Sequence, residues 1–493
     1  MDERAGLKTI VAPLLVFALA LPGCGGGGGT TPTPQTTPTP PPVKASIIVI
    51  LADDLDWDPI GVMARTRSLV ADQGVTFTNS FAMTPVCAAS RAAFLTGRYP
   101  HNNGVRGNGG FPEVRDLGIE PASLGPWMKT AGYRTALLGK YENNYPAGEE
   151  GYIPPGWDGW YGVFEDRGAS QFDWTMNENG SVARYKGGAE AFQTDVLTEK
   201  AGAFIRATAS TQPFFMLLGV TPPHGPSEAA PRHQGMFGGR GVPRGASFNE
   251  SDVLDKPRWV RNIPLMSGRQ IAELDDLYSA RLDSVQSLDE MVGKLFETLQ
   301  ATGRLDKTYV FITSDNGLLL GQHRVAGGKN SAYEESISIP LLVRGPGVPA
   351  GRQLPHVVGN IDMAPTFLAI AGAPIPANVD GRSLLPLLSA APPPQSAWRQ
   401  DILIESNGGF GGVAGEEGSG VRVPAYNAVR QASADGDYIY VEYTGSNDRE
   451  LYNLRDDSDQ LANAINAVDP ALVQRLSARI AALKDCRAES CRQ

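Results

Sequence analysis

The sequence predicts an α/β fold: a large, mixed but mostly parallel sheet with helices on both faces, followed by a smaller C-terminal antiparallel sheet with a helix. Runs rich in β-branched residues at 46–51, 213–220, 308–313 and 339–343 are typical of buried strands of a parallel sheet. Helical patterns lie between them, the clearest at 269–299, where apolar residues recur about every 3.6 residues. Strands that alternate with helices indicate the α/β class.

The N-terminus is typical of an export signal. Lys8 precedes an apolar run at 10–21 that is too short to span a bilayer. The run ends in Leu-Pro-Gly-Cys24, which resembles the bacterial lipobox, whose cysteine is lipidated after cleavage; an ordinary signal peptide with an incidental cysteine is the alternative. We therefore expect a signal peptide over 1–23 and an exported bacterial lipoprotein, periplasmic or on the cell surface, whose contact with the membrane is the lipid on Cys24.

Two folded units are expected after this signal. Residues 24–44 contain a glycine run and Thr-Pro repeats, which cannot form a core and suit an extended tether. The main unit is predicted over 45–390, and a Pro-rich break then leads into a small α+β unit over 391–493. In this second unit the expected elements are short strands at 401–404, 426–430 and 438–442 and a helix at 470–483.

Composition restricts the partners. The formal net charge of −10 over 493 residues gives no global attraction for nucleic acid, so an anionic substrate needs a local cluster of cations. Only five histidines are present, which limits the number of zinc ligands. Cys486 and Cys491 could close a small disulfide loop in an oxidising compartment, with two free thiols as the alternative.

Polar residues follow three of the predicted strands. Asp53 and Asp54 follow the first, His224 the second, and Asp315 and Asn316 the third. Open α/β sheets bind ligands at the carboxyl ends of their strands, so we expect these side chains to converge at one edge. Taken singly, the Asp-Asp pair could cap a loop and the Asp-Asn-Gly run could form a turn.

Cys87 precedes a short Ala-rich helical pattern that holds Arg91 one turn further on. A helix N-terminus offers free N–H groups and a positive dipole end, and Arg91 adds a fixed cation. Such surroundings suit a nucleophile that attacks an anion, and they suit a structural buried cysteine equally well.

The segment from Cys87 to Arg98 resembles the signature of the sulfatase family, Cys-x-Pro/Ala-Ser-Arg followed by Thr-Gly-Arg. Ser90, Arg91 and 95–98 match, and Ala89 stands where proline is commoner. The resemblance covers about residues 45–465. It implies an alkaline-phosphatase-like fold and oxidation of Cys87 to formylglycine by a formylglycine-generating enzyme.

The resemblance also assigns a metal site and sulfate-binding residues. The implied ligands of a divalent cation are Asp53, Asp54, the oxygen made from Cys87, Asp315 and Asn316. Such oxygen donors favour Ca2+, with Mg2+ as the alternative. Further matched residues imply sulfate binding by Lys140 and Lys329 and contact of His224 with the ester oxygen.

One position departs from the family pattern. Many sulfatases carry a histidine two residues after the first lysine, where this chain has Glu142. The run from Lys140 to Tyr145 is similar to the glucosamine-6-sulfatase branch, which also lacks that histidine. His323 could assist in its place, although a structural role fits as well. Tyr426 and Arg430 are candidates for the outer substrate pocket.

These features predict a sulfatase that hydrolyses sulfate monoesters, either an aryl sulfate or a glycan sulfate such as a 6-sulfated hexosamine. In the implied mechanism Arg91 and the two lysines neutralise the sulfate oxygens while the formylglycine hydrate attacks sulfur. A phosphonate or phosphate ester hydrolase of the same superfamily is the nearest rival. A two-zinc phosphatase fits poorly because histidines are few, and a non-catalytic, lipid-anchored binder of sulfated glycans is the alternative from another class.

Overall fold

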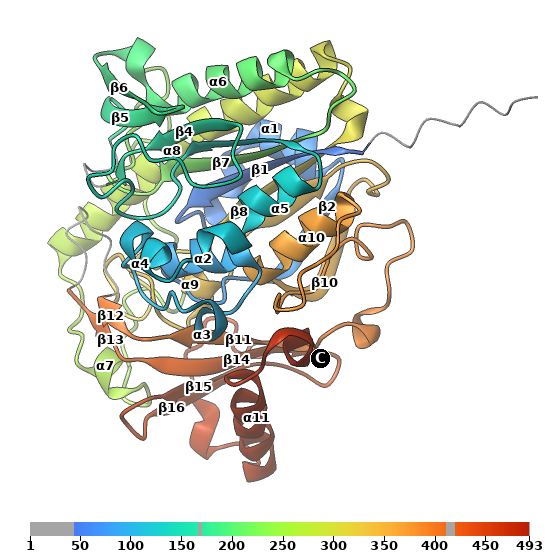
Figure 1. The fold of residues 1–493 in the computed structure, drawn as a ribbon. Coiled ribbons are helices and arrows are strands. Elements are labelled where there is room, and N and C mark those ends of the chain that lie inside the picture. The colour runs from blue at the N-terminus through green and yellow to red at the C-terminus, as the bar shows by residue number, and fades with distance from the viewer. Residues whose placement is uncertain (1–43, 166–169, 411–419, 493) are drawn as a thin grey trace, which may run out of the picture. The chain divides into compact units, whose positions relative to one another are not determined.

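The computed structural model describes residues 44–165, 170–410 and 420–492. Residues 43–493 form one compact unit (Figure 1). The predicted signal peptide, the tether and Cys24 lie outside the described residues. In the described part of the chain no helix is both long enough and apolar enough to cross a membrane.

The main sheet has ten strands, and most of its neighbouring pairs are parallel. This confirms the predicted fold class. Across the sheet the strands are β10 (Arg352–Gly359), β2 (Val75–Phe81), β9 (Leu341–Arg344), β8 (Thr308–Ser314), β1 (Ser46–Asp53), β7 (Phe214–Pro223), β3 (Arg134–Gly139), β4 (Gly159–Val163), β5 (Asp173–Glu178) and β6 (Ser181–Lys186).

The predicted strands β1, β7 and β8 lie side by side and parallel, with Val49 of β1 opposite Leu217 and Phe311. Strand β9 corrects the prediction of a parallel strand, because it runs antiparallel to both β8 and β2. The connection from β8 to β9 contains only the short helix α9 (Glu334–Ile337) and no helix that returns across the sheet. The chain therefore stays at the edge where β8 ends and runs back from there.

Helices cover both faces of this sheet, as predicted (Figure 1). Ile47, Val49 and Leu51 of β1 pack in one cluster with α2 (Cys87–Thr96), α5 (Leu124–Thr130) and α10 (Met363–Ile370). The alternate residues Ile48 and Ile50 pack with α6 (Gln193–Ala207) and with α8 (Gly268–Ala301), which was the clearest predicted helix. The remaining short helices are α1 (Ala64–Thr66), α3 (Pro100–Asn103), α4 (Phe111–Asp116) and α7 (Arg258–Arg261).

The C-terminal unit contains the predicted small antiparallel sheet, in the order β11-β14-β15-β16. Its strands are β11 (Asp401–Ser406), β14 (Tyr426–Ser433), β15 (Gly436–Tyr443) and β16 (Arg449–Asn453), and β12 (Gly409–Phe410) pairs separately with β13 (Arg422–Val423). The predicted helix is α11 (Pro470–Leu483), which buries Leu476, Ile480 and Leu483 against the sheet. Phe81 and Val357 of the main sheet belong to the same hydrophobic cluster, so the two sheets share a core.

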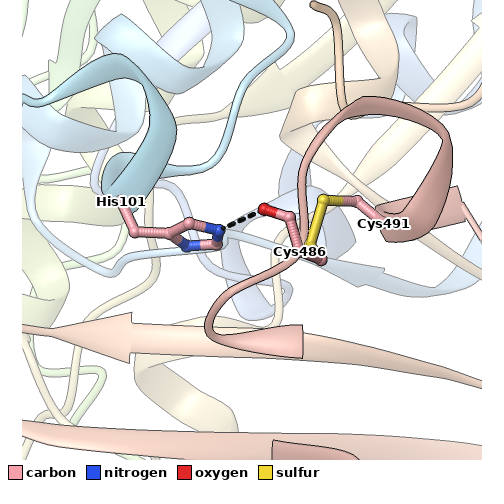
Figure 2. A group of neighbouring side chains, drawn as sticks. All are labelled: His101, Cys486 and Cys491. Atoms are coloured by element: carbon pink, nitrogen blue, oxygen red, sulfur yellow. Dashed lines mark hydrogen bonds between the residues drawn. A yellow bond between two sulfur atoms is a disulfide. The ribbon is translucent and has the colours of Figure 1, made fainter. Parts of the chain in front are cut away.

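A disulfide joins Cys486 and Cys491 near the C-terminus, as the sequence predicted, in place of the two free thiols that were the alternative. His101 of α3 lies beside this loop, with its Nε2 atom 3.1 Å from the carbonyl oxygen of Cys486 (Figure 2). The other ring nitrogen, Nδ1, is 2.8 Å from a carboxylate oxygen of Glu405 in β11. His101 therefore links α3 to both the second sheet and the C-terminal disulfide loop.

Candidate active site

The polar residues predicted to converge do so at the carboxyl edge of β1 and β8. Ligand atoms of Asp53, Asp54, Cys87 and Asp315 all lie within 4.8 Å of one another. The backbone of Asp54 adopts a left-handed conformation with φ of 60°, which is uncommon outside glycine. It is held by its N–H, which donates to Asp315 Oδ1 at 3.1 Å. Strain of this kind is typical of functional sites.

Helix α2 presents Cys87 as its first residue. Val86 before it is extended, and Gly97 ends the helix in a left-handed conformation with φ of 65°. The Ser90 hydroxyl donates to the carbonyl of Asp315 and accepts a hydrogen bond from Asn360 at 2.7 Å. The signature serine therefore fixes the helix to the end of β8 and places Cys87 against the carboxylates.

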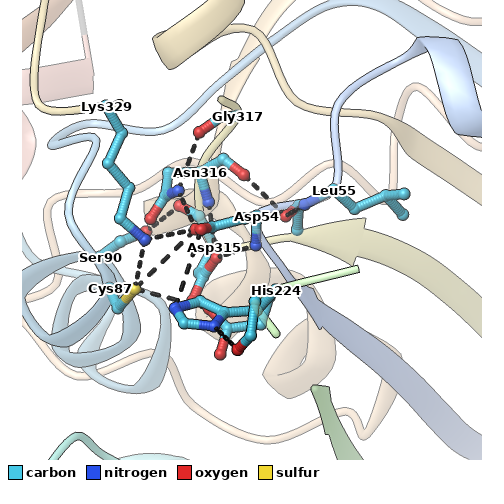
Figure 3. A network of polar contacts seen from close by, with 12 residues as sticks. Asp54, Leu55, Cys87, Ser90, His224, Asp315, Asn316, Gly317 and Lys329 are labelled. Atoms are coloured by element: carbon cyan, nitrogen blue, oxygen red, sulfur yellow. Dashed lines mark hydrogen bonds and ion pairs between the residues drawn. The ribbon is translucent and has the colours of Figure 1, made fainter. Parts of the chain in front are cut away.

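Three buried cations surround these carboxylates. Arg91 donates through Nε to Asp315 Oδ2 at 2.9 Å, and its Nη2 lies 3.8 Å from Asp53. Lys140, directly after β3, has its Nζ 2.6 Å from Asp53 Oδ2. Lys329 reaches Asp54 and also lies 2.8 Å from Cys87 Sγ (Figure 3). The cluster can therefore neutralise an anionic group placed next to Cys87.

The charges in this cluster shift one another's ionisation. Burial opposes the ionisation of Asp53, but Lys140, His224 and Arg91 together hold its pKa well below the usual range. Burial, reinforced by the charge of Asp53, raises the pKa of Asp315 to about 6. Burial also raises the pKa of the Cys87 thiol well above its usual value, although Lys329 acts in the opposite direction. An unmodified Cys87 would therefore remain a neutral thiol, which is a weak nucleophile.

The residues at this edge fit a hard divalent cation. Among the described residues, neither Asp54 Oδ2 nor Asn316 Oδ1 has a hydrogen-bond partner, although both atoms are buried. The amide nitrogen of Asn316 donates hydrogen bonds to Asp54 Oδ1 at 2.6 Å and to the carbonyl oxygen of Gly317 at 3.0 Å. The amide oxygen of Asn316 is therefore free to act as a metal ligand. With Asp53 and Asp315 these atoms form an all-oxygen ligand set, as Ca2+ and Mg2+ require.

His224 follows β7 and lies at the edge of the cluster, partly exposed (Figure 3). Its Nδ1 atom lies 2.7 Å from the carbonyl oxygen of Gly225, an acceptor, so this nitrogen carries the proton. The other nitrogen, Nε2, is 3.9 Å from Asp54 Oδ2. This orientation presents Nε2 to a group bound over the carboxylates, where it could exchange a proton.

Glu142 occupies the position at which the sequence departs from the family pattern. Its side chain is completely buried, and neither carboxylate oxygen has a hydrogen-bond partner among the described residues. Burial raises its pKa well above the usual value, despite the nearby charges of Arg91 and Lys140. Glu142 therefore remains protonated at pH values at which a free glutamate side chain is already ionised.

Glu165 is a site residue that the sequence interpretation missed. Its Oε2 atom lies 3.3 Å from the Nζ of Lys140, so this lysine contacts two carboxylates. Glu165 lies two residues after the end of β4, and no sequence motif marks it. Its position at the end of β4, which neighbours β3, was the available signal.

The three remaining candidates contact groups in the protein core. His323 is fully buried, with Nδ1 2.8 Å from Glu250 and its ring stacked on Tyr333. Arg430 forms ion pairs with Glu334 at 2.7 Å and with Asp437 at 2.5 Å. Tyr426 packs edge-on against Tyr443. His323 and Arg430 therefore have partners within the protein, and Tyr426 also lines a polar cavity beside the second sheet. The substrate contacts expected of these three residues stay predictions.

Two family models together, and several known proteins, match the chain over most of its length. The model of the sulfatase family matches residues 45–373, and that of the C-terminal region of N-sulphoglucosamine sulphohydrolase matches residues 321–485. N-acetylglucosamine-6-sulfatase of Homo sapiens is 32% identical over 491 residues, which cover 91% of this chain and 86% of the human protein.

Solved structures share the fold. One of them, determined in complex with its substrate D-glucosamine-2-N,6-O-disulfate, has a TM-score of 0.75 and 22% identity, covering 89% of this chain and 97% of its own. A phosphonate monoester hydrolase from Silicibacter pomeroyi has a TM-score of 0.65 and 22% identity, covering 88% of this chain and 94% of its own. At these identities the likeness establishes the fold alone.

Proposed function

The chain belongs to the sulfatase family and is a sulfuric ester hydrolase, and we propose that its substrate is a glycan that carries a 6-O-sulfated glucosamine unit. The observation that supports this substrate most directly is the relationship to N-acetylglucosamine-6-sulfatase, which extends over 91% of this chain. The run from Lys140 to Tyr145, similar to that branch of the family, supports the same substrate. Aryl sulfates are the second candidate.

We further propose that Cys87 is converted to formylglycine and that Asp53, Asp54, Asp315 and Asn316 hold Ca2+, with Mg2+ as the alternative. When present, the hydrated aldehyde supplies a nucleophilic hydroxyl and the cation supplies positive charge to the sulfate oxygens. The position of the Cys87 side chain supports the conversion, because it lies within 4.8 Å of the Asp53, Asp54 and Asp315 carboxylates, where an oxygen suits a hard cation better than a thiol does.

The remaining steps are assigned to side chains of the chain itself. Arg91, Lys140 and Lys329 would bind the three non-ester oxygens of the sulfate and stabilise the charge that shifts between them in the transition state. With both ring nitrogens protonated, His224 would give its Nε2 proton to the departing sugar oxygen, which is otherwise a poor leaving group, and would keep the Nδ1 proton that faces the carbonyl of Gly225. Asp315, whose carboxylate lies within 4.8 Å of the Cys87 side chain, would accept a proton from the attacking hydroxyl.

A panel of defined sulfate esters tests the substrate. We expect the highest kcat/KM on 6-O-sulfated N-acetylglucosamine, with lower values on its 3-O- and 4-O-sulfated isomers and on an aryl sulfate. An aryl phosphonate monoester in the same assay addresses the rival hydrolase, and preference for it would refute the proposal. Cys87→Ala, purified in parallel, controls for sulfatase carried over from the host.

Mass spectrometry and elemental analysis test the two proposed groups. In protein made with a formylglycine-generating enzyme, the peptide with residue 87 should have lost sulfur and gained oxygen. Fully active protein with an intact thiol would refute this step. Active protein should contain Ca2+ or Mg2+, and stoichiometric zinc in their place would refute the metal assignment.

The non-catalytic binder is the less supported alternative. A binder that has lost activity should lack the nucleophile position or a metal carboxylate, whereas Cys87, Asp53, Asp54 and Asp315 are all present and adjacent. We propose export and lipid anchoring through Cys24 on the sequence alone. Fatty-acid labelling of the wild type and of Cys24→Ala should give label on the wild type only and release the variant from membranes.

A further inference from the structure

A polar cavity of about 140 Å³ lies between the loop after α3 and the ends of β11 and β14 in the second sheet. Its lining includes Arg106, Glu405, Ser406, Asn407, Asn427 and Thr444. It is smaller than the roughly 300–1,000 Å³ of pockets that enclose a whole drug-sized ligand. It therefore suits one substituent of a larger ligand whose remainder lies elsewhere.

Both walls of this cavity are attached to residues that flank Cys87. On one side Asn108, two residues after Arg106, accepts a hydrogen bond from the N–H of Ala88 at 3.1 Å. On the other side Ser406 donates to the side chain of Asn330 at 2.6 Å. The N–H of Asn330 in turn donates to the carbonyl of Pro85 at 2.9 Å. The walls of the cavity are therefore connected by hydrogen bonds to the neighbours of Cys87, and its lining includes none of the proposed metal ligands or sulfate-binding cations.

The cavity has one cation that the protein leaves uncompensated. Arg106 is exposed and donates to the carbonyl oxygen of His101 at 3.4 Å, and no ion pair among the described residues includes it. The carboxylate in the lining, Glu405, is occupied by His101, which contacts it through its backbone N–H at 3.0 Å and through Nδ1 at 2.8 Å. The lining therefore offers the guanidinium of Arg106 beside a carboxylate that is already engaged by His101.

We propose that this cavity binds an anionic substituent, a sulfate or a carboxylate, on the saccharide next to the one that is desulfated. Arg106 would form the ion pair, and Asn407, Asn427 and Thr444 would offer amide and hydroxyl groups to the sugar. The proposal rests on the proposed glycan-sulfatase function and narrows its substrate to an anionic chain of at least two saccharides.

The test compares substrates that share the 6-O-sulfated N-acetylglucosamine unit and differ in the neighbouring saccharide. The neighbour is a neutral hexose, a uronate or a hexose with its own sulfate, and the last two distinguish the sources of the anion. For wild type, kcat/KM should be about tenfold higher with an anionic neighbour, as expected for a charge-assisted hydrogen bond at an exposed site.

Arg106→Ala should abolish this preference for an anionic neighbour, and Arg106→Lys should retain part of it. Arg184→Ala removes an exposed arginine on β6, in the main sheet, and should keep the full preference. Equal kcat/KM for neutral and anionic neighbours in wild type, or the same preference in Arg106→Ala, would overturn the proposal.

Calorimetry separates failure of this proposal from failure of the proposed function. If no 6-O-sulfated compound is hydrolysed, the function is wrong, and binding of the uronate-containing disaccharide without its 6-sulfate still tests the cavity. Wild type should bind it about tenfold more tightly than Arg106→Ala does. Equal affinities would overturn the cavity assignment in that case also.

Discussion

The catalytic edge and the second sheet both bury charged groups, but they differ in how completely the protein pairs them. Around Arg430 in β14, the guanidinium meets carboxylates of Glu334 and Asp437, and its Nη1 also donates to a backbone carbonyl. At the catalytic edge, Asp54 Oδ2, Asn316 Oδ1 and Arg91 Nη2 are buried without hydrogen-bond partners among the described residues.

This difference distinguishes ionic groups that hold the fold from those that await a ligand. A buried polar atom without a partner costs about 1–3 kcal/mol, so several of them in one place weaken the protein unless something else binds there. The catalytic edge combines them with the left-handed backbone of Asp54. Functional sites commonly sacrifice stability in this way. Four substitutions or titrations can test the distinction.

The largest effect is expected from Asp54→Asn. The change removes an anionic metal ligand and should lower kcat at least about 1,000-fold, through loss of transition-state stabilisation. It also leaves the buried ammonium of Lys329 without its carboxylate partner. Burial opposes the ionisation of Asp54, but Lys329 and His224 lower its pKa, so the fold favours the charged form and the metal-free variant should unfold at a lower temperature than wild type. Steady-state kinetics and thermal unfolding measure the two quantities, and a kcat close to that of wild type would contradict the assignment of Asp54 to the ligand set.

Arg430→Met should lower stability without loss of activity. Removing one partner of a fully buried ion pair costs about 3–5 kcal/mol, but Glu334 and Asp437 are 24% and 30% exposed and can be rehydrated, so we expect about 2 kcal/mol. The kcat and KM of the folded enzyme should change less than about twofold, since the chemistry is elsewhere. Denaturant unfolding measures the cost. A raised KM with unchanged stability would instead support the sequence prediction that Arg430 contacts substrate.

The catalytic edge was the part of the molecule most accessible from sequence. Asp53, Asp54 and Cys87 lie in short local segments, and the rule that ligands bind at the carboxyl ends of parallel strands brings such segments together. The strands β1, β7 and β8 were equally clear, because strands buried on both faces are continuously apolar.

Features that depend on tertiary pairing were not accessible. Strand β9 is antiparallel to β8 because the chain between them stays at the edge of the sheet where β8 ends. The apolar residues of a strand do not indicate whether it runs parallel or antiparallel to its neighbours. Strand β16 contains Arg449 and Glu450, and the carboxylate of Glu450 is buried only because Tyr443 and Tyr452 donate to it at 2.7 Å. The contacts of Glu165 and Arg430 likewise join segments that carry no common motif.

A smaller effect is expected from Glu142→Gln. Burial raises the pKa of Glu142 above its usual value of 4.5, so the folded protein binds a proton that the unfolded chain releases. The free energy of unfolding therefore falls as the pH rises from the unfolded pKa toward the folded one. The neutral amide of the variant would carry no such penalty, so the variant should unfold at the same temperature as wild type at pH 4 and at the same or a higher temperature at pH 7. Lower stability at pH 7 would show that the carboxyl is ionised and paired.

The smallest effect is expected from the titration of His101, which contacts the second sheet and the disulfide loop. Both ring nitrogens face oxygen acceptors, Glu405 at 2.8 Å and Cys486 at 3.1 Å, an arrangement that favours the doubly protonated ring. Burial acts against this charge, but the hydrogen bond and the charge of Glu405 outweigh it and raise the pKa of His101. Below the unfolded pKa of about 6.5 the stabilisation is fully present, and it is lost as the pH rises through the folded pKa.

Wild type should therefore lose free energy of unfolding as the pH rises above about 6.5, by at most about 1.4 kcal/mol per pH unit because a single proton is involved. In His101→Asn this part of the slope should disappear, while the kcat of folded protein stays within about twofold of wild type because the residue lies outside the cluster around Cys87. Urea unfolding at a series of pH values measures the slope. His356→Asn is the matched control, because that imidazole contacts the carbonyl oxygen of Pro393 and burial lowers its pKa, so its removal should leave the alkaline slope unchanged. An alkaline slope that survives in His101→Asn would mean that Glu405 is held by the backbone N–H of residue 101 alone, and that the second sheet is joined to α3 without an ionic contact.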